Sequence, residues 1–152
     1  MEISVDIPTD ESGFMRRECP NCERQFKWFL GASANRPEDF LDPELYYCPY
    51  CGETAPHNAW WTKEQIEYAE AMAAGPAMKM ASRELEKTLR GMKGLKFSPN
   101  RNMRGPEPPL PMIESDDMTM VASPCHDFEP VKIAEDWVDP VHCLICGGTY
   151  SV

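Results

Sequence analysis

Three pairs of cysteines, each pair separated by two residues, constrain this 152-residue chain more than any other feature. The pairs are Cys19-Pro-Asn-Cys22, Cys48-Pro-Tyr-Cys51 and Cys143-Leu-Ile-Cys146, and a seventh cysteine, Cys125, lies between the second and third pairs. An odd number of cysteines cannot form a closed set of disulfides. Two tetrahedral metal sites account for all seven if one histidine is added, because Zn²⁺ takes four Cys or His ligands.

The first two pairs predict one metal site with Cys19, Cys22, Cys48 and Cys51 as ligands. Each turn has the form Cys-Pro-x-Cys, and Gly52 follows the second. Over about residues 14 to 61 this pattern resembles the zinc knuckle of the zinc-ribbon and rubredoxin-like families. The resemblance implies a structural zinc and a local fold, and it implies nothing about function.

The third pair predicts one half of a second site, with Cys143 and Cys146 as ligands. The other half has only Cys125 as a thiol, and we favour the adjacent His126 as the fourth ligand because imidazole suits zinc. Asp127, His142 and His57 remain open as alternatives, since neighbouring residues rarely point at one ion. Residues 118 to 152 thus resemble a second zinc ribbon with a degenerate first turn, and we expect two structural Zn²⁺ ions in the chain.

The Cys48-Pro-Tyr-Cys51 turn also matches the redox motif of glutaredoxins. A redox dithiol has its first cysteine at the start of a helix, which lowers the pKa of that thiol. Here Gly52 and Pro56 follow, and the next helix start is at Thr62. We therefore rank a thiol redox protein last.

We expect no catalytic activity and no small-molecule substrate. Four thiolates, or three thiolates and one imidazole, leave no open position for water, which catalytic zinc usually retains. The sequence also lacks a glycine-rich phosphate loop, a Gly-x-Ser-x-Gly turn and a His-Glu-x-x-His helix.

The alternation of apolar and polar residues predicts short strands around these turns. Residues 14–18 and 24–29 should form a hairpin around the first turn, and Tyr46 and Tyr47 should end the strand that leads into the second. Further strands or turns are expected at 3–7, 118–122, 129–133 and 137–141.

A helix is predicted to begin after Thr62. Thr62 and Gln65 fit a capping box, and Trp61 and Ile66 fit a hydrophobic staple. The helix should run to about Ala74, where Gly75 and Pro76 stop or kink it before a second helix over about residues 77–91. The apolar face of that second helix comprises Met78, Ala81, Leu85, Leu89 and Met92.

The expected fold is a small, metal-bound α+β protein in which a kinked helical segment and a proline-rich linker join two zinc-ribbon modules. The predicted boundaries are residues 1–61 for the first ribbon, 62–94 for the helical segment, 95–117 for the linker and 118–152 for the second ribbon.

Charge is distributed unevenly along the chain. The net charge is −10, but residues 79–104 carry +6 and the remainder −16. A strongly acidic chain disfavours general nucleic-acid binding, whereas the basic segment favours contact with an acidic partner or with phosphates. The candidate contact residues are the basic helix face and two aromatics expected to be exposed: Lys79, Arg83, Lys87, Arg90, Tyr50 and Trp60.

The sequence also predicts a cytoplasmic protein. No apolar run approaches the roughly 20 residues that span a bilayer, and Met1 and Glu2 open no signal-peptide pattern. Paired cysteines in a reducing compartment are more often metal ligands than disulfides.

These observations favour a non-catalytic zinc-binding adaptor or accessory subunit that binds another protein. The alternative is a nucleic-acid-binding accessory factor that uses residues 79–104. Binding of DNA or RNA that weakens with salt and is lost on charge reversal of the basic face would favour the alternative.

Overall fold

The computed structural model describes residues 4–91, 94 and 107–152. In chain order the elements of these residues are β1 (Phe14–Glu18), β2 (Gln25–Phe29), β3 (Leu45–Tyr47), β4 (Thr54–Pro56), the short 3-10 helix η1 (His57–Ala59), α1 (Lys63–Arg90), β5 (Met118–Val121), β6 (Val131–Ala134), β7 (Val141–His142) and β8 (Thr149–Tyr150). The strands predicted around the first turn and near residues 46, 118 and 131 are therefore confirmed.

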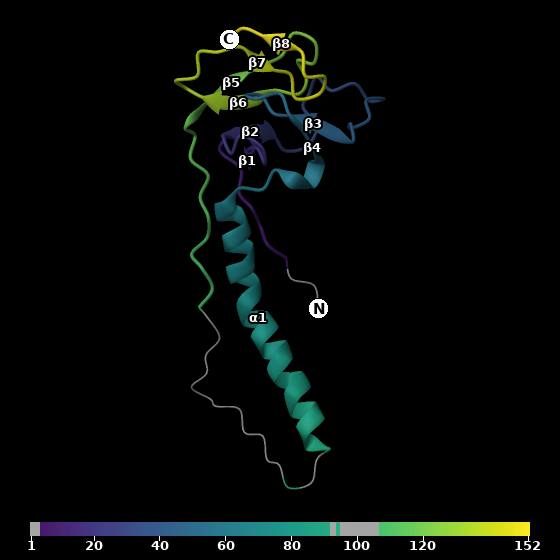
Figure 1. Cartoon of the computed structure of the whole chain (residues 1–152), viewed down its shortest axis with the longest axis vertical. Helices are drawn as coiled ribbons and strands as arrows, with labels where there is room; N and C mark the ends of the chain where they lie inside the picture. The colour runs from purple at the N-terminus through teal and green to yellow at the C-terminus, as the bar shows by residue number, and fades with distance from the viewer. Residues whose placement is uncertain (1–3, 92–93, 95–106) are drawn as a thin grey trace. The chain divides into compact units, whose positions relative to one another are not determined.

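Strands from the two ends of the chain form one antiparallel sheet in the order β1-β2-β6-β5 (Figure 1). In the middle of this sheet Trp28 on β2 pairs with Val131 on β6. One of two compact units is Ile7–Lys63 together with Ile113–Val152, and it contains strands from both of the expected modules, 1–61 and 118–152. A two-stranded hairpin is marginal alone, and pairing with β6 supplies the further strands that stability requires.

The two faces of this sheet have opposite character, because successive side chains of a strand point to opposite sides. Phe26 and Trp28 lie on the face that forms the apolar core, whereas Lys27 lies on the other face. The buried core draws on both ends of the chain: Met15, Phe26, Trp28, Tyr46, Tyr50, Trp60, Val131, Ile133, Val141 and Leu144. The core side of the sheet therefore also supports the metal-ligating turns.

A network of buried ion pairs covers the opposite face. Asp10 Oδ2 lies 3.2 Å from Lys27 Nζ and 2.8 Å from Lys132 Nζ, and these two lysines are cross-strand neighbours. Glu114 Oε1 lies 3.1 Å from Lys27 Nζ, and Asp116 Oδ1 lies 2.8 Å from Lys132 Nζ. The network fastens the chain just before β5 to the sheet, and the charges compensate one another as buried charges must.

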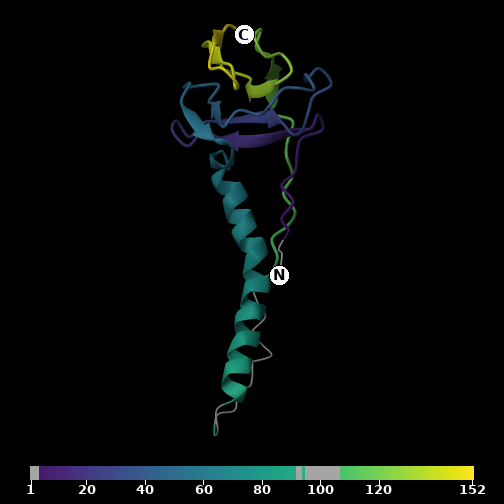
Figure 2. The same cartoon turned by 90° about the vertical axis from the view of Figure 1, so that its right-hand side faces the viewer.

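Helix α1 is a single helix of 28 residues that runs through Gly75 and Pro76 (Figure 2). It begins at Lys63, directly after the predicted N-cap Thr62. The expected break into two helices is wrong. Pro76 removes one backbone hydrogen bond, but the alanines and methionines on both sides favour helix strongly enough to continue it. Within the described ranges, no helix is both long enough and apolar enough to cross a membrane.

Two other predictions differ from the structure or lie outside it. Residues 4–7 form no strand; instead Ile7 packs against the core, and Asp10 Oδ1 accepts hydrogen bonds from the N–H groups of Ser12 and Phe14. Residues 4–10 are therefore irregular, and a turn stabilised by Asp10 follows them. Most of the predicted linker, with Lys96, Arg101 and Arg104, lies outside the described residues, and residues 107–117 contain no helix or strand.

Candidate metal centres

The three cysteine turns fold alike; we call residues 19–22 turn 1, residues 48–51 turn 2 and residues 143–146 turn 3. In each, the N–H of the residue after the second cysteine donates to the carbonyl of the first cysteine. These bonds are Glu23 to Cys19 at 2.9 Å, Gly52 to Cys48 at 3.0 Å and Gly147 to Cys143 at 2.9 Å. The shared bond closes the backbone so that both sulfurs of a turn face one point, as metal binding requires.

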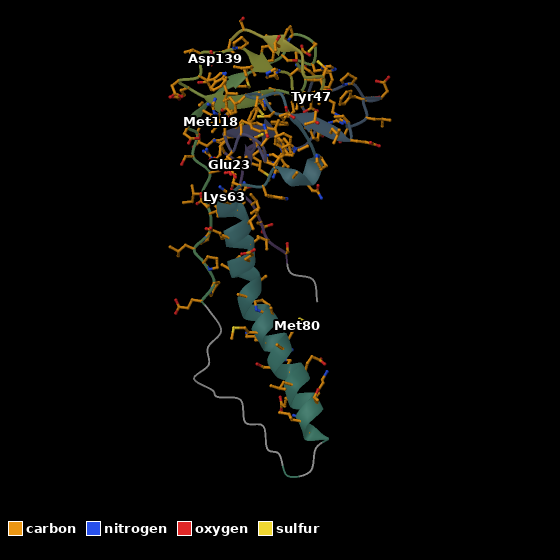
Figure 3. All side chains as sticks on the ribbon, viewed as in Figure 1. Glu23, Tyr47, Lys63, Met80, Met118 and Asp139 are labelled. Atoms are coloured by element: carbon orange, nitrogen blue, oxygen red, sulfur yellow. The ribbon has the colours of Figure 1, made fainter. Side chains whose placement is uncertain are left out.

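Closing the turn places the residue after the second cysteine in the left-handed backbone region. Gly52 and Gly147 take φ values of 76° and 75°, and Glu23 takes 60° at the matching position of turn 1. Glycine adopts this conformation freely, whereas a residue with a Cβ pays about 1 kcal/mol. Glu23 lies beside Lys63 at 3.4 Å, an exposed pair that offsets little of this strain (Figure 3).

Turns 1 and 2 together form the first candidate metal centre. The ligand atoms of Cys19, Cys22, Cys48 and Cys51 all lie within 4.8 Å of one another. The Sγ atoms of Cys19 and Cys51 are 3.7 Å apart, and those of Cys22 and Cys48 are 3.8 Å apart. Tetrahedral Zn–S bonds of about 2.3 Å place sulfurs about 3.8 Å apart, so these residues fit a zinc ion without rearrangement.

Backbone and side-chain donors surround these sulfurs. The N–H groups of Asn21 and Cys22 lie 3.4 Å from Cys19 Sγ, and the Asn21 amide lies 3.7 Å from Cys51 Sγ. Burial raises the pKa of Cys48. Burial acts in the same sense on Cys51, but the Glu53 N–H and the Asn21 amide outweigh it and lower the pKa of Cys51. Donors of this kind orient thiolates and hold them ionised on a cation.

The second candidate centre combines turn 3 with Cys125 and His126. The ligand atoms of Cys125, His126, Cys143 and Cys146 also lie within 4.8 Å of one another. His126 Nδ1 lies 3.5 Å from Cys143 Sγ, and Cys125 Sγ lies 3.3 Å from Cys146 Sγ. Three thiols and one imidazole form a closed tetrahedral set.

The alternative fourth ligands have other positions. His142 Nδ1 lies 3.2 Å from the carbonyl oxygen of Gly147, and the His57 ring stacks on Trp28 with a centroid separation of 5.9 Å. Asp127 is not among the residues that the structure gathers into the second cluster. Among the described residues, His126 is the histidine that the structure brings to the second cluster.

Sequence reasoning missed Ser123. Its Oγ lies 3.1 Å from Cys143 Sγ and 3.3 Å from Cys125 Sγ, and it accepts a hydrogen bond of 2.9 Å from the His126 N–H. Cys19 Sγ accepts the equivalent bond from the Cys22 N–H in turn 1. Residues 123–126, Ser-Pro-Cys-His, therefore correspond to a Cys-Pro-x-Cys turn, and the shared proline is the signal that would have revealed Ser123.

The Ser123 hydroxyl also affects the neighbouring thiol. Hydrogen bonds from Ser123 and then Cys146 lower the pKa of Cys125 to about 6. A thiol with this pKa is mostly ionised at neutral pH, which is the form that binds metal.

The two centres differ in their access to solvent. Cys19 and Cys48 are at most 1% exposed, whereas Cys125 and Cys146 are exposed. An open cavity of about 500 Å³ adjoins the second centre, lined by Phe40, Phe128 and Leu41 together with Cys125 and His126. With Cys22 and Cys51 half-buried and Cys143 buried, the first centre is the more buried of the two, and the second is the more open to solvent.

The predicted contact residues divide into two groups. Lys79, Arg83, Lys87 and Arg90 are exposed on α1, and two of them lie beside carboxylates, Lys87 3.5 Å from Glu84 and Arg90 2.7 Å from Glu86. On the predicted apolar face of this helix Met78 and Leu85 are exposed. Whether this helix contacts a partner remains a prediction.

The expectation that Tyr50 and Trp60 are exposed is wrong. Trp60 is fully buried with its ring 5.7 Å from that of Phe26, and the Tyr50 hydroxyl donates to the Gln25 carbonyl at 2.7 Å. Both rings fill the core beneath the joined sheet. The neighbouring Trp61 is the one left 40% exposed.

No known protein family, curated protein or solved structure matches this chain. The candidate metal sites are therefore assigned from the distances between their ligand atoms, and the function is inferred from the same arrangement.

Proposed function

We propose that both centres bind structural Zn²⁺ and that the chain is a non-catalytic adaptor or accessory subunit that binds another protein. The observation that carries this proposal is the composition of the two ligand sets, four thiols in one and three thiols with one imidazole in the other. Such sets suit zinc among the common metals, and all four corners are taken by side chains. A set of this kind serves to hold chain segments together.

The positions of the ligands support this structural role. The first centre joins the hairpin of β1 and β2 to the hairpin of β3 and β4, and the second joins the chain after β5 to turn 3. Several of the joined strands have only two to five residues, so they bury little surface of their own. Bound metal therefore contributes folding free energy directly, as in other small metal-bound domains.

Exposed apolar side chains support the protein-binding part of the proposal. Trp61, Met80 and Leu85 are 40, 44 and 48% exposed. Tryptophan and methionine are enriched at protein interfaces, where large side chains supply most of the binding free energy. Figure 3 shows Met80 on α1, the long helix that carries two of these residues.

A metal measurement tests the first half of the proposal. Elemental analysis of the purified full chain should give two zinc ions per chain, and chelation should unfold the strands, as followed by circular dichroism. Fewer than two ions together with titratable thiols would overturn the structural assignment and favour a redox function.

A comparison of surface variants tests the second half. The tagged chain is recovered from cells of its own source, and its partners are quantified by mass spectrometry. A protein partner should be lost from Trp61→Ala or from Met80→Glu with Leu85→Glu, but retained by the control Val138→Ala, whose side chain is 88% exposed. Recovery of nucleic acid in place of protein, abolished by charge reversal at Lys79 and Arg83, would contradict the adaptor function.

A further inference from the structure

Four charged residues are buried in the described part of the chain: Asp10, Arg17, Lys27 and Lys132. Three of them belong to the ion-pair network on the outer face of the sheet. Arg17 does not, because it lies one residue beyond Arg16 on β1 and therefore projects to the core face. Among the described residues it makes no ion pair and no hydrogen bond through its side chain. Of these four residues it is the one with no ion pair among the described residues.

The surroundings of Arg17 explain which of its atoms are unpaired. The guanidinium carbon lies 4.3 Å from the ring centroid of Trp28 and 4.4 Å from that of Trp61. The two indoles stabilise the charge through their faces. The N–H groups of a guanidinium lie in its plane, pointing away from such rings, and Nε is buried without a hydrogen-bond partner.

Stacking alone does not balance the burial of this charge. Arg17 is 4% exposed, so almost all of its surface is withdrawn from water. Removing a cation from water is unfavourable unless an anion with good hydrogen-bond geometry accompanies it. Elsewhere in the same unit that requirement is met: Arg36 lies 2.8 Å from Asp42 and 3.1 Å from Glu129 beside a cavity of about 260 Å³.

Trp61, the outer ring of this stack, is partly open to solvent. With 40% of its surface exposed, it presents a large apolar side chain directly beside the unpaired guanidinium. Aromatic residues and arginines at such positions are the commonest energetic centres of protein interfaces. A ligand for this site therefore needs an apolar group to cover the Trp61 ring and an acceptor for the unpaired N–H of Arg17.

We propose that Arg17 and Trp61 form a docking site for a carboxylate-bearing segment of a protein partner. The carboxylate pairs with the edge of the Arg17 guanidinium, and an adjacent aromatic or aliphatic side chain covers the exposed face of Trp61. This inference deepens the proposed protein-binding function and rests on it.

A single carboxylate fits this site better than a phosphate chain. A lone planar guanidinium matches the two oxygens of a carboxylate. The chain itself carries a net charge of −10, which opposes binding of a polyanion. The expected segment therefore has one Asp, Glu or terminal carboxylate among neutral, apolar neighbours.

Stability of the isolated protein distinguishes a docking residue from a structural one. Arg17→Met keeps a long apolar side chain between the two indoles and removes the uncompensated charge. We expect it to raise the melting temperature of the zinc-loaded full chain by about 4 °C or more. A lower melting temperature would mean that the stack alone stabilises the charge, and it would overturn the proposal.

A pair of matched probes tests the binding chemistry. N-acetyltryptophan carries a carboxylate beside an indole, and N-acetyltryptophan amide differs only in lacking that charge. Titration followed by the NMR signals of Arg17 Nε–H and of the Trp61 indole should show saturable binding of the acid at least tenfold tighter than of the amide. Arg17→Met should abolish this difference, and the control Arg36→Met should retain it.

Other outcomes of this titration decide against the proposal. Equal binding of acid and amide, no binding of the acid, or tighter binding of inorganic phosphate or of an oligothymidylate would each overturn it. Capture of a partner separates this site from the proposed protein-binding function. A partner captured equally by wild type and Arg17→Met would overturn the docking site but support protein binding, and no captured partner at all would count against protein binding itself.

Discussion

The backbone N–H of Tyr47 donates a hydrogen bond of 2.9 Å to the carbonyl of Leu144. The reciprocal bond, from the His142 N–H to the Pro49 carbonyl, has the same length. The two donors, Tyr47 and His142, directly precede the first cysteine of their own turns. The two acceptors, Leu144 and Pro49, directly follow the first cysteine of the opposite turn. Turns 2 and 3 thus brace each other, and each belongs to a different metal centre.

This bracing predicts that the two centres are coupled. In Cys125→Ser with Cys146→Ser the second centre loses its metal, turn 3 loosens and turn 2 loses part of its support. Release of zinc from the first centre to a chromogenic chelator should then become about tenfold faster, which corresponds to a barrier to release that is lower by about 1.4 kcal/mol. The control Arg36→Met breaks two ion pairs of the same unit, with Asp42 and Glu129, and changes no residue of either turn. An unchanged release rate in the double variant would show that the centres are independent.

Gly147 provides a second test of the same contact. A Cβ on Gly147 would lie 2.6 Å from Tyr47 Cδ1, and the residue has a φ of 75°. Gly147→Ala should lower the free energy of unfolding by about 3 kcal/mol, from backbone strain and overpacking together. Gly31→Ala is the matched control, because Gly31 has a φ of 93° but nothing within 4 Å of its Cβ position. Equal losses in chemical denaturation would mean that the Tyr47 contact contributes nothing.

Glu23 occupies the position that glycine occupies in turns 2 and 3. Glu23→Gly removes the left-handed strain and the exposed pair with Lys63. The free energy of unfolding should rise by about 0.5 kcal/mol, because relief of strain exceeds the added entropy of the unfolded chain. The reverse exchange, Gly52→Glu, should destabilise strongly, since a Cβ there would lie 2.9 Å from the His142 ring. A loss of stability in Glu23→Gly would contradict the assigned strain.

Ser123 is predicted to strengthen metal binding at the second centre. Ser123→Ala removes the hydroxyl beside Cys143 and Cys125 and the acceptor of the His126 N–H. Zinc affinity of this centre, measured by chelator competition, should fall about tenfold, as for other residues that orient metal ligands. The exposed Ser151→Ala should have no effect, and the same affinity in both variants would remove Ser123 from the site.

The Asp10 carboxylate makes the stability contributed by the buried ion pairs depend on pH. Although burial acts in the opposite sense, hydrogen bonds from Lys132, the Phe14 N–H and Lys27 lower the pKa of Asp10 to about 2. Since this lies below the unfolded value of about 3.9, the stability it contributes is present above about pH 5 and is lost as the pH falls toward 2. Asp10→Asn should therefore destabilise the protein by about 2 kcal/mol at pH 7.

The test is to measure the difference in free energy of unfolding between wild type and Asp10→Asn as a function of pH. Wild type and Asp10→Asn share the same metal ligands, so acid-induced release of metal is common to both. Their difference in free energy of unfolding should shrink between pH 5 and pH 2, and the half-exposed Asp116→Asn should cost much less at pH 7. A difference that does not change with pH would contradict the lowered pKa.

The local elements of this chain followed from the sequence alone. The alternation around turn 1 predicted β1 and β2, and the helix start after Thr62 was found at Lys63. The six candidate ligands in the three cysteine pairs were also named from spacing, because a two-residue gap between cysteines fixes a turn whatever surrounds it. Such features depend on residues within a few positions of one another.

Tertiary structure decided the rest. Pairing of Trp28 with Val131 across 103 positions joined two expected modules into one sheet and drew Trp60 and Tyr50 into the core. It also placed Ser123 against two sulfurs and left Arg17 between two indoles without an anion. A local sequence pattern indicates the preferred conformation of each residue. Burial and strand pairing depend instead on segments that are distant in the sequence, and a local pattern does not specify those segments.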